Sequence, residues 1–127
     1  GDVSSATHNR ENYLGGLIGA SRQQSTQSIL ACYATGTVST TGSYDKNVGG
    51  LFGRYDLYDG VARMTGCYTT CNKGTYGFGT GSDETDLTLT DVEIIAGPVT
   101  DKASDMNRAA ERYPYQYDEN AKIISME

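Results

Sequence analysis

The chain has 127 residues, 16 of them glycine and 10 tyrosine, a size and composition that favour one domain of short strands joined by tight turns and argue against a bundle of long helices. Its net charge of -6 opposes binding to nucleic acid or to anionic lipid. No apolar run approaches the roughly 20 residues that a membrane-spanning helix needs, so we expect no membrane-spanning segment in this chain.

The first twelve residues are polar and show no strand or helix pattern. They contain His8, the only histidine, which we expect to be solvated and inert. Because the chain begins at Gly1 and not at a methionine, we interpret it as a processed or excised form. With one histidine and no convergent set of acids, bases and nucleophiles, the sequence predicts no catalytic residues and no cofactor.

Residues 13–82 contain a sequence repeated in tandem. The segment from Leu14 to Gly19 matches that from Val48 to Gly53 at an offset of 34 residues, and a second matching block follows at an offset of 35. Two blocks in the same order indicate true repetition, so we divide residues 1–82 into units of about 13–47 and 48–82. The residues that define the repeat are Gly15, Gly16, Leu17, Gly19 and Cys32 in the first unit, and Gly49, Gly50, Leu51, Gly53 and Cys67 in the second.

The contents of the unit predict strands, although helical repeats share this period. Three glycines in six residues cost about 1 kcal/mol each inside a helix, whereas the Thr, Tyr and Val that follow suit strands. Equivalent strands of the two units are expected to pair about 4.8 Å apart, with the glycines at corners that need a positive φ or a close backbone approach. The predicted ladder pairs are Leu17 with Leu51, Ile18 with Phe52, and Cys32 with Cys67.

Residues 20–28 and 54–63 occupy equivalent places between the two blocks but share almost no sequence. We expect them to be loops in which binding residues vary, and we expect residues 39–47 to connect the two units.

Four tyrosines are the candidate binding residues. Tyr33 and Tyr68 are expected to point outward from equivalent positions, and Tyr55 and Tyr58 lie in the second of the variable segments. An exposed row of tyrosines would stack on sugar rings or anchor a protein partner. The alternative, which we favour, is that they pack on one another and keep an outer face dry.

Cys32, Cys67 and Cys71 are an odd number of cysteines and stand at no zinc spacing, so we expect no metal site from them. Neither Cys67 nor Cys71 has a cationic neighbour in the sequence that would stabilise a thiolate. We therefore interpret them as buried structural thiols, with a disulfide and a redox pair left open.

Two acidic patterns are similar to known functional sites, but we do not predict a function from either of them. The run from Gly77 to Asp83, followed by Glu84 and Asp86, is weakly similar to calcium-binding loops, and Asp56 with Asp59 is a carboxylate pair of the kind used in glycoside cleavage. A single loop copy is weak evidence for calcium, and charges three residues apart in a loop are ordinary surface.

Residues 83–127 no longer follow the repeat and are predicted to cap it within the same domain, because the last strands of a repeat array are exposed. Residues 87–95 predict one or two strands. Residues 103–110 have helical spacing, with Thr100 or Asp101 as the cap and Pro114 as the end. The alternating tyrosines at 113, 115 and 117, a turn at 118–120 and the segment from Lys122 to Met126 predict a hairpin.

The strings Gly-Gly-Leu-Ile-Gly, Ile-Leu-Ala-Cys-Tyr-Ala-Thr-Gly-Thr-Val and Gly-Gly-Leu-Phe-Gly resemble the GLUG repeat of bacterial surface proteins, over about residues 13–72. The second unit departs from the pattern at Gly66 and Cys71, and the repeat then decays into a glycine-rich run. The resemblance implies an all-β fold, a right-handed β-helix-like solenoid of GLUG-type repeats, here with a C-terminal cap of strand, helix and hairpin. It also implies a surface location, in putative adhesins and secreted proteins of Bacteroides-type bacteria.

These observations favour a non-catalytic, adhesin-type or structural module of a bacterial cell-surface or secreted protein. Its partner would be a surface protein or a glycan. The alternative is an accessory β-helix module that recognises or degrades glycans, for which an acidic pair beside a tyrosine-lined groove is the expected feature.

Overall fold

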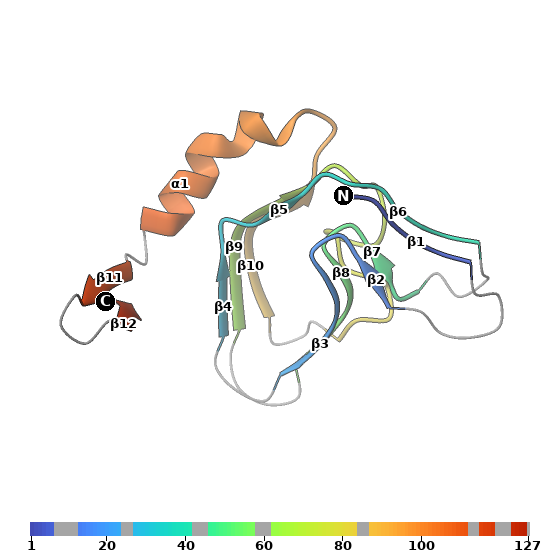
Figure 1. Ribbon diagram of the computed structural model, residues 1–127, viewed down its shortest axis with the longest axis horizontal. Coiled ribbons are helices and arrows are strands. Elements are labelled where there is room, and N and C mark those ends of the chain that lie inside the picture. The colour runs from blue at the N-terminus through green and yellow to red at the C-terminus, as the bar shows by residue number, and fades with distance from the viewer. Residues whose placement is uncertain are drawn as a thin grey trace.

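The computed structural model of the chain describes residues 1–6, 13–23, 27–41, 46–57, 62–83, 87–111, 115–118 and 123–126. The elements are, in order, β1 (Val3–Ser5), β2 (Leu14–Gly15), β3 (Ile18–Gln23), β4 (Gln27–Leu30), β5 (Tyr33–Ala34), β6 (Val38–Thr40), β7 (Val48–Gly49), β8 (Phe52–Leu57), β9 (Ala62–Thr69), β10 (Leu87–Ile94), the 3-10 turn η1 (Val99–Lys102), α1 (Ala103–Glu111), β11 (Tyr115–Asp118) and β12 (Ile123–Met126). Figure 1 shows β4, β9 and β10 facing β3 and β8, with α1 on the other side of that sheet.

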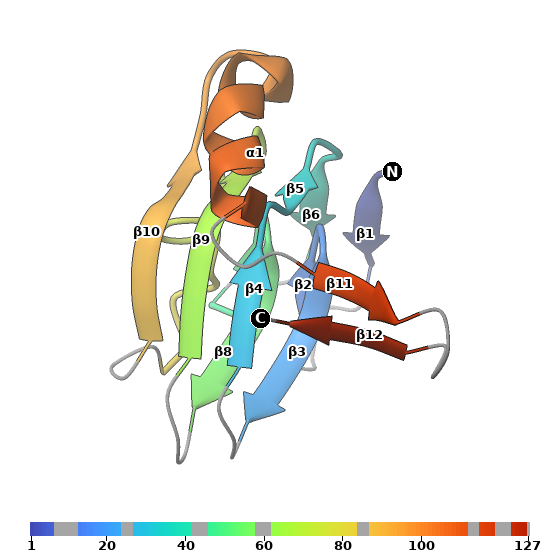
Figure 2. The same cartoon turned by 90° about the vertical axis from the view of Figure 1, so that its left-hand side faces the viewer.

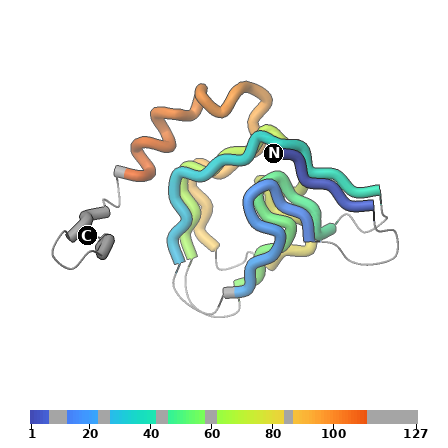
Figure 3. The backbone as a smooth tube through the Cα atoms, viewed as in Figure 1, coloured from blue at the N-terminus to red at the C-terminus, as the bar shows by residue number. Residues whose placement is uncertain are grey.

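The parallel strand pairs join equivalent positions of the two sequence units. β3 lies beside β8 with Ile18 opposite Phe52, at the predicted offset of 34 residues, and β2 lies beside β7 at the same offset. β4 and β5 lie beside β9 at the predicted offset of 35, which places Tyr33 opposite Tyr68. Figure 3 shows the two units running side by side through the same bends. The predicted register of the repeat is confirmed.

The predicted fold class, an all-β right-handed β-helix-like solenoid of GLUG-type repeats, is wrong. Within the described residues the strands form five separate sheets, four of them with only two strands, and a short α-helix is added. A solenoid runs its strands as continuous sheets through many turns, whereas here two of the five sheets consist of one short strand from each sequence unit. Of the strands named above, only β9 has strand neighbours on both sides. The molecule is a set of small parallel strand pairs.

A third segment, described at residues 75–83 and 87–94 and beginning within the predicted second unit, pairs with the earlier part of that unit at a shorter offset. β10 lies beside β9 with Leu87 opposite Ala62, a separation of 25 residues. Isolated parallel bridges join Phe52 to Phe78 and connect the end of β8 to Asp83. The glycine-rich run in which the repeat decays is therefore a shortened segment that packs on the second unit.

Three neighbouring backbones bend at one register position. Ala31, Gly66 and Asp91 have positive φ values of 52°, 66° and 53°, and the residues just before them are in register. This left-handed backbone turns the chain from β4 into β5 and puts the same bend in β9 and β10 (Figure 1). Glycine adopts this conformation freely, whereas a side chain at the other two positions costs about 1 kcal/mol.

The core lies between the β4–β9–β10 sheet and strands β7 and β8, which begin in the glycine block that runs from Val48 to Gly53. Phe52 and Phe78 stack with their ring centroids 5.1 Å apart, and Tyr55 meets both rings edge-on. Leu51 and Met64 are fully buried beside them. Burial of these side chains, at about 25 cal/mol per Å² of apolar surface, is the main force that holds the strand pairs together.

The glycines of the two blocks lie where backbones approach closely. A Cβ on Gly15 would collide with the Ile18 carbonyl, and one on Gly49 would collide with the Phe52 carbonyl. None of the glycines in these two blocks has a positive φ. The prediction that they allow a close backbone approach is therefore confirmed, and the prediction of a positive φ is wrong. The glycines for which a Cβ would meet another atom closer than 3.0 Å include Gly15, Gly16, Gly19, Gly49, Gly50 and Gly53.

The C-terminal segment follows the predicted order of strand, helix and hairpin. β10 is a single strand, and β11 and β12 pair antiparallel. The predicted cap at Thr100 or Asp101 is wrong, because the helical turn begins earlier, after Pro98, and has no side-chain cap. Pro114 lies outside the described residues. Neither helical segment in the described chain is long and apolar enough to cross a membrane.

Helix α1 lies against β9 at Gly66. Ala109 is the buried residue of the helix, and a Cβ on Gly66 would lie only 2.8 Å from the Ala109 Cβ. Lys102 of η1 pairs with Glu93 of β10 at 2.9 Å. The departure of Gly66 from the repeat is thus explained by the helix that packs on it. Figure 2 shows α1 lying over this sheet, of which β10 forms one edge. A capping role for residues 83–127 stays a prediction.

Candidate functional site

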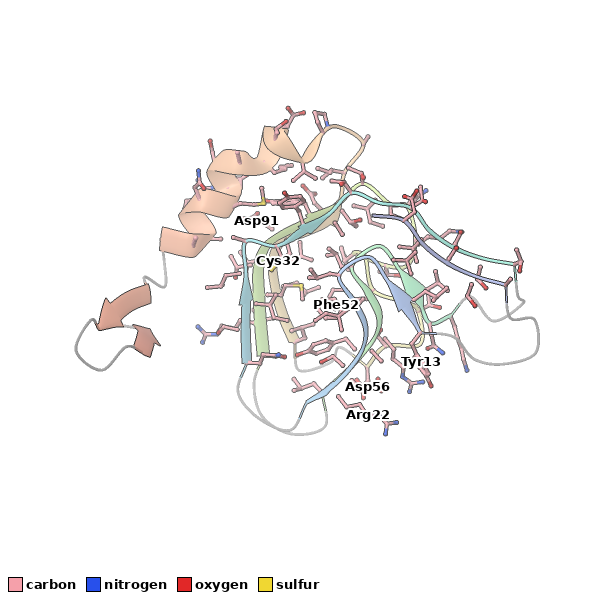
Figure 4. All side chains as sticks on the ribbon, viewed as in Figure 1. Tyr13, Arg22, Cys32, Phe52, Asp56 and Asp91 are labelled. Carbon is pink, nitrogen blue, oxygen red and sulfur yellow. The ribbon has the colours of Figure 1, made fainter. Side chains whose placement is uncertain are left out.

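A groove of about 470 Å³ lies along β3 and β8. Its volume is in the range of pockets that hold small ligands. Figure 4 shows Tyr13, Arg22 and Asp56 near one another at the lower edge of the view. The residues that line the groove are Tyr13, Ala20, Ser21, Arg22, Arg54 and Asp56.

The register of the two strands sets the order of these side chains. Ala20 of β3 lies opposite Arg54 of β8, and Arg22 lies opposite Asp56. Because alternate residues of a strand face opposite ways, these four share one face, whereas Tyr55 points into the core. The groove is therefore built from positions at which the backbones of the two units match and their side chains differ.

Asp56 anchors one wall of the groove. Its carboxylate is 3% exposed and accepts a hydrogen bond from Nε of Arg54 at 2.8 Å and another from the backbone N–H of Asp83 at 3.2 Å. A charge-assisted hydrogen bond to a buried carboxylate orients the guanidinium firmly. The Arg54 side chain, 30% exposed, is held at the groove in this way, and the third segment, through Asp83, helps to hold it.

The other charged and aromatic members of the groove are exposed. Tyr13 is 41% exposed, and Arg22 is exposed on β3. An aromatic ring offers an apolar face to a sugar, and a guanidinium matches the two oxygens of a carboxylate. The groove thus combines two cations and one carboxylate on a chain whose overall charge is -6. Its chemistry suits a ligand that has both a flat face and an anionic group.

The predicted tyrosine row does not exist as an exposed surface. Tyr33 is 57% exposed, but Tyr68, its neighbour in register, is 1% exposed. The exposed row, which we did not favour, fails at Tyr68, because η1 covers this side chain and places the Lys102 ammonium 5.4 Å from its ring centre. Burial is the main cause that raises the pKa of Tyr68, followed by the negative charge of Asp105. Tyr68 is structural.

Tyr55 is also structural. It is fully buried against Phe52 and Phe78, and its hydroxyl donates a hydrogen bond to Oε1 of Gln27 at 2.7 Å. Burial raises its pKa. Tyr58, the fourth candidate, lies outside the described residues. Of the candidate tyrosines that the structure describes, Tyr33 is the one that a ligand can reach.

The three cysteines carry free thiols, Cys67 buried and Cys32 and Cys71 half-buried. The described residues contain no group of three or more His, Cys, Asp or Glu side chains that would hold a metal ion. In the run from Gly77 to Asp83, Gly77 accepts hydrogen bonds from Leu51 and Phe52 through its carbonyl oxygen, so this run has a packing role. Glu84, Asp86, Asp59 and His8 lie outside the described chain.

Sequence reasoning did not assign Tyr13, Arg22 or Arg54 to a site. The pattern that indicated the location of the two arginines was the difference in sequence between residues 20–28 and 54–63, which occupy equivalent places in the two units. Those segments were predicted to be loops, and this is wrong for their ends, which continue β3 and β8 and begin β4 and β9. Backbone hydrogen bonds hold strands in register without any likeness of side chains, so variable sequence was not a sign of a loop.

No protein-family model, curated protein or solved structure matches this chain. The function is therefore argued from the groove and from the repeat.

Proposed function

We propose that this chain is a non-catalytic binding module of a bacterial cell-surface or secreted protein, and that the groove of β3 and β8 holds its ligand. The resemblance of its two glycine blocks to GLUG repeats supports the surface location. The adhesin-type role follows from that location together with a groove whose members include an aromatic ring and two guanidinium groups.

The observation that carries the proposal is the way the groove is assembled. Its walls come from two strands with matched backbones, and its polar side chains stand at the positions where the two sequence units differ. Conversely, the matched positions Leu51 and Phe52 are buried in the core. Recognition residues that vary on a constant backbone are typical of binding scaffolds.

The ligand class that the groove favours is a glycan that contains an acidic sugar. Tyr13 would stack on a sugar ring, and Arg22 would bind the carboxylate through two parallel hydrogen bonds. Arg54, oriented by Asp56, would add a second donor. A neutral glycan would lack the carboxylate that the guanidinium groups would bind, so it is expected to bind more weakly.

The test is calorimetric titration of the whole chain with a defined oligosaccharide of uronic acids and with its neutral counterpart. The acidic oligosaccharide is expected to bind and the neutral one to bind much more weakly. Arg22→Ala is expected to weaken binding about 10- to 100-fold, since a hydrogen bond to a charged group contributes about 1.5–3 kcal/mol.

Two controls keep the test specific. Arg63→Ala removes an exposed arginine from β9, outside the groove, and is expected to leave binding unchanged. Arg22→Lys keeps the charge but loses the planar fork, and is expected to give an intermediate affinity. Equal binding of both oligosaccharides would contradict the acidic ligand, and release of reducing ends during incubation would contradict a non-catalytic role.

A further inference from the structure

The two cysteines of the repeat lie opposite each other on neighbouring backbones. Tyr33 and Tyr68, one residue further along, are in register, and the N–H of Tyr68 donates a hydrogen bond to the carbonyl of Cys32 at 3.0 Å. Cys32 is therefore the register partner of Cys67. Parallel strands lie about 4.8 Å apart, within the Cα separation of about 4.4–6.8 Å that a disulfide bridges.

The two thiols also have matching orientations. Sγ of Cys32 lies 3.3 Å from the carbonyl oxygen of Leu30, and Sγ of Cys67 lies 3.6 Å from that of Thr65, in each case two residues earlier in the chain. Sγ of Cys67 is also 3.9 Å from the carbonyl oxygen of Ile29, which belongs to the neighbouring β4. The Cys67 side chain therefore reaches across to the strand that leads to Cys32.

The two thiols differ in access and in acidity. Cys67 is fully buried in the core, whereas Cys32 is half-buried at its edge. A hydrogen bond from the Cys67 thiol lowers the pKa of Cys32 to about 7. The same hydrogen bond, together with burial, raises the pKa of Cys67. An accessible thiolate beside a buried thiol is the arrangement in which the first attacks and the second resolves.

We propose that Cys32 and Cys67 are a thiol–disulfide exchange site that closes into a disulfide between the two repeat units on reaction with a small-molecule disulfide. The Cys32 thiolate attacks one sulfur of the oxidant, forms a mixed disulfide and releases one thiolate. The Cys67 thiol then loses its proton and attacks Sγ of Cys32, which forms the intramolecular bond and releases the second thiolate. Two cysteine thiols are oxidised, and the oxidant is reduced to two thiols. The site is independent of the β3–β8 groove.

Cys71 is not a competing partner in this geometry. It follows the end of β9, four residues beyond Cys67, and the N–H of Thr70 already pairs with the carbonyl of Ala34 at 3.3 Å. The backbone opposite Cys71 has therefore passed Cys32. Cys71→Ser removes the third thiol without touching the pair and is the matched background for the experiment.

The test treats the Cys71→Ser chain with glutathione disulfide, alkylates it under denaturing conditions and measures the intact mass. The expected product has lost two hydrogens, carries no glutathione and no alkyl group, and yields a Cys32–Cys67 cross-linked peptide on non-reducing digestion. The bond would close a loop that spans a whole repeat, so Tm is expected to rise by about 10 °C and to fall back on reduction.

A second variant separates exchange from simple burial. In Cys67→Ala on the Cys71→Ser background, Cys32 has no resolving thiol and is expected to accumulate a stable glutathione adduct. In Cys32→Ser on the same background, the buried Cys67 is expected to remain unmodified under native conditions.

Two results would overturn the proposal. One is full alkylation of both thiols of the Cys71→Ser chain after exposure to the oxidant. The other is a glutathione adduct that persists on Cys32 while Cys67 is present. Because both are read on the chain that retains the pair, they decide the question even if the alanine variant does not fold.

Discussion

The first and second repeat units share a backbone register but not a degree of burial. Ile18 is 39% exposed, whereas Phe52, its partner in register, is fully buried. Tyr33 is 57% exposed and Tyr68 only 1%. The sequence of the repeat does not account for this, because the positions are equivalent. The neighbours of each unit account for the difference in burial, because the second unit has the first unit on one side and the third segment on the other.

The difference in burial mainly separates residues that stabilise the fold from residues that are accessible to a ligand or a reagent. The second unit supplies Phe52, Tyr55 and Met64 to the core. The first unit supplies Arg22 to the groove and the accessible Cys32 to the thiol pair. The second copy of the repeat therefore supplies most of the buried layer, and the first supplies the more exposed members of the groove and of the thiol pair.

The largest effect expected from this comparison is at the aromatic stack. Phe52→Ala removes a ring that contacts both Phe78 and Tyr55 and is expected to lower the free energy of unfolding by about 3–5 kcal/mol. Ile18→Ala, at the equivalent position of the first unit, is expected to cost about 1 kcal/mol, because its side chain is already partly in water. Urea denaturation measures both, and equal losses would show that the two units contribute alike.

Smaller effects are expected at the bend, where substitutions in the two units are expected to differ in sign. Gly66→Ala puts a Cβ at a φ of 66° and against Ala109, and is expected to cost about 2 kcal/mol. Ala31→Gly, at the same register position of the first unit, removes a side chain from a φ of 52° and is expected to be neutral or to stabilise by less than about 1 kcal/mol. Thermal unfolding of the two variants checks the pair, and a loss above about 1 kcal/mol for Ala31→Gly would contradict a strained bend.

The smallest effect concerns alkaline pH. Burial raises the pKa of Tyr55 and of Tyr68 above their ordinary value of 10.0, so the folded state holds their protons more tightly than the unfolded state. This contribution is complete below about pH 10 and is lost as the pH rises through the folded pKa values, by at most about 1.4 kcal/mol per pH unit for each tyrosine. Denaturation midpoints from pH 9 to about 11 measure the loss.

The control for that experiment is Tyr68→Phe, which removes one of the two titrating groups and keeps the ring. Its midpoint is expected to fall less steeply with pH than that of the unchanged chain. Parallel curves for the two proteins would mean that Tyr68 keeps an ordinary pKa in the folded state.

The pairing of strands could be predicted from the sequence, because the glycines of the two blocks match in only one register, in which Gly15 meets Gly49 and Ile18 meets Phe52. The fold class could not, since the shortened third segment has no sequence match that marks its offset. It pairs through backbone hydrogen bonds, and its Phe78 stacks on Phe52 and meets Tyr55 edge-on.

The candidate site could be predicted only in outline. Variable segments indicated where binding residues lie, but the groove depends on Asp56 meeting Arg54 and Asp83, a contact across 27 residues that no local pattern encodes. The exposure of the tyrosines was harder still to predict. Tyr33 and Tyr68 are equivalent in sequence, and only the packing of η1 on one of them decides which is available.

The long spacing between paired strands governs how fast this chain folds. Every parallel pair among the described strands brings together residues at least 25 positions apart, so a loop of that length closes before the first strand hydrogen bond forms. The backbone hydrogen bonds within helix α1 and within the β11–β12 hairpin, by contrast, join residues close in the sequence. Folding of the strand pairs is expected on the order of milliseconds to seconds, as for other domains dominated by non-local contacts. During that interval the apolar strands of the second unit are exposed, and their self-association is the main hazard for this protein in concentrated solution.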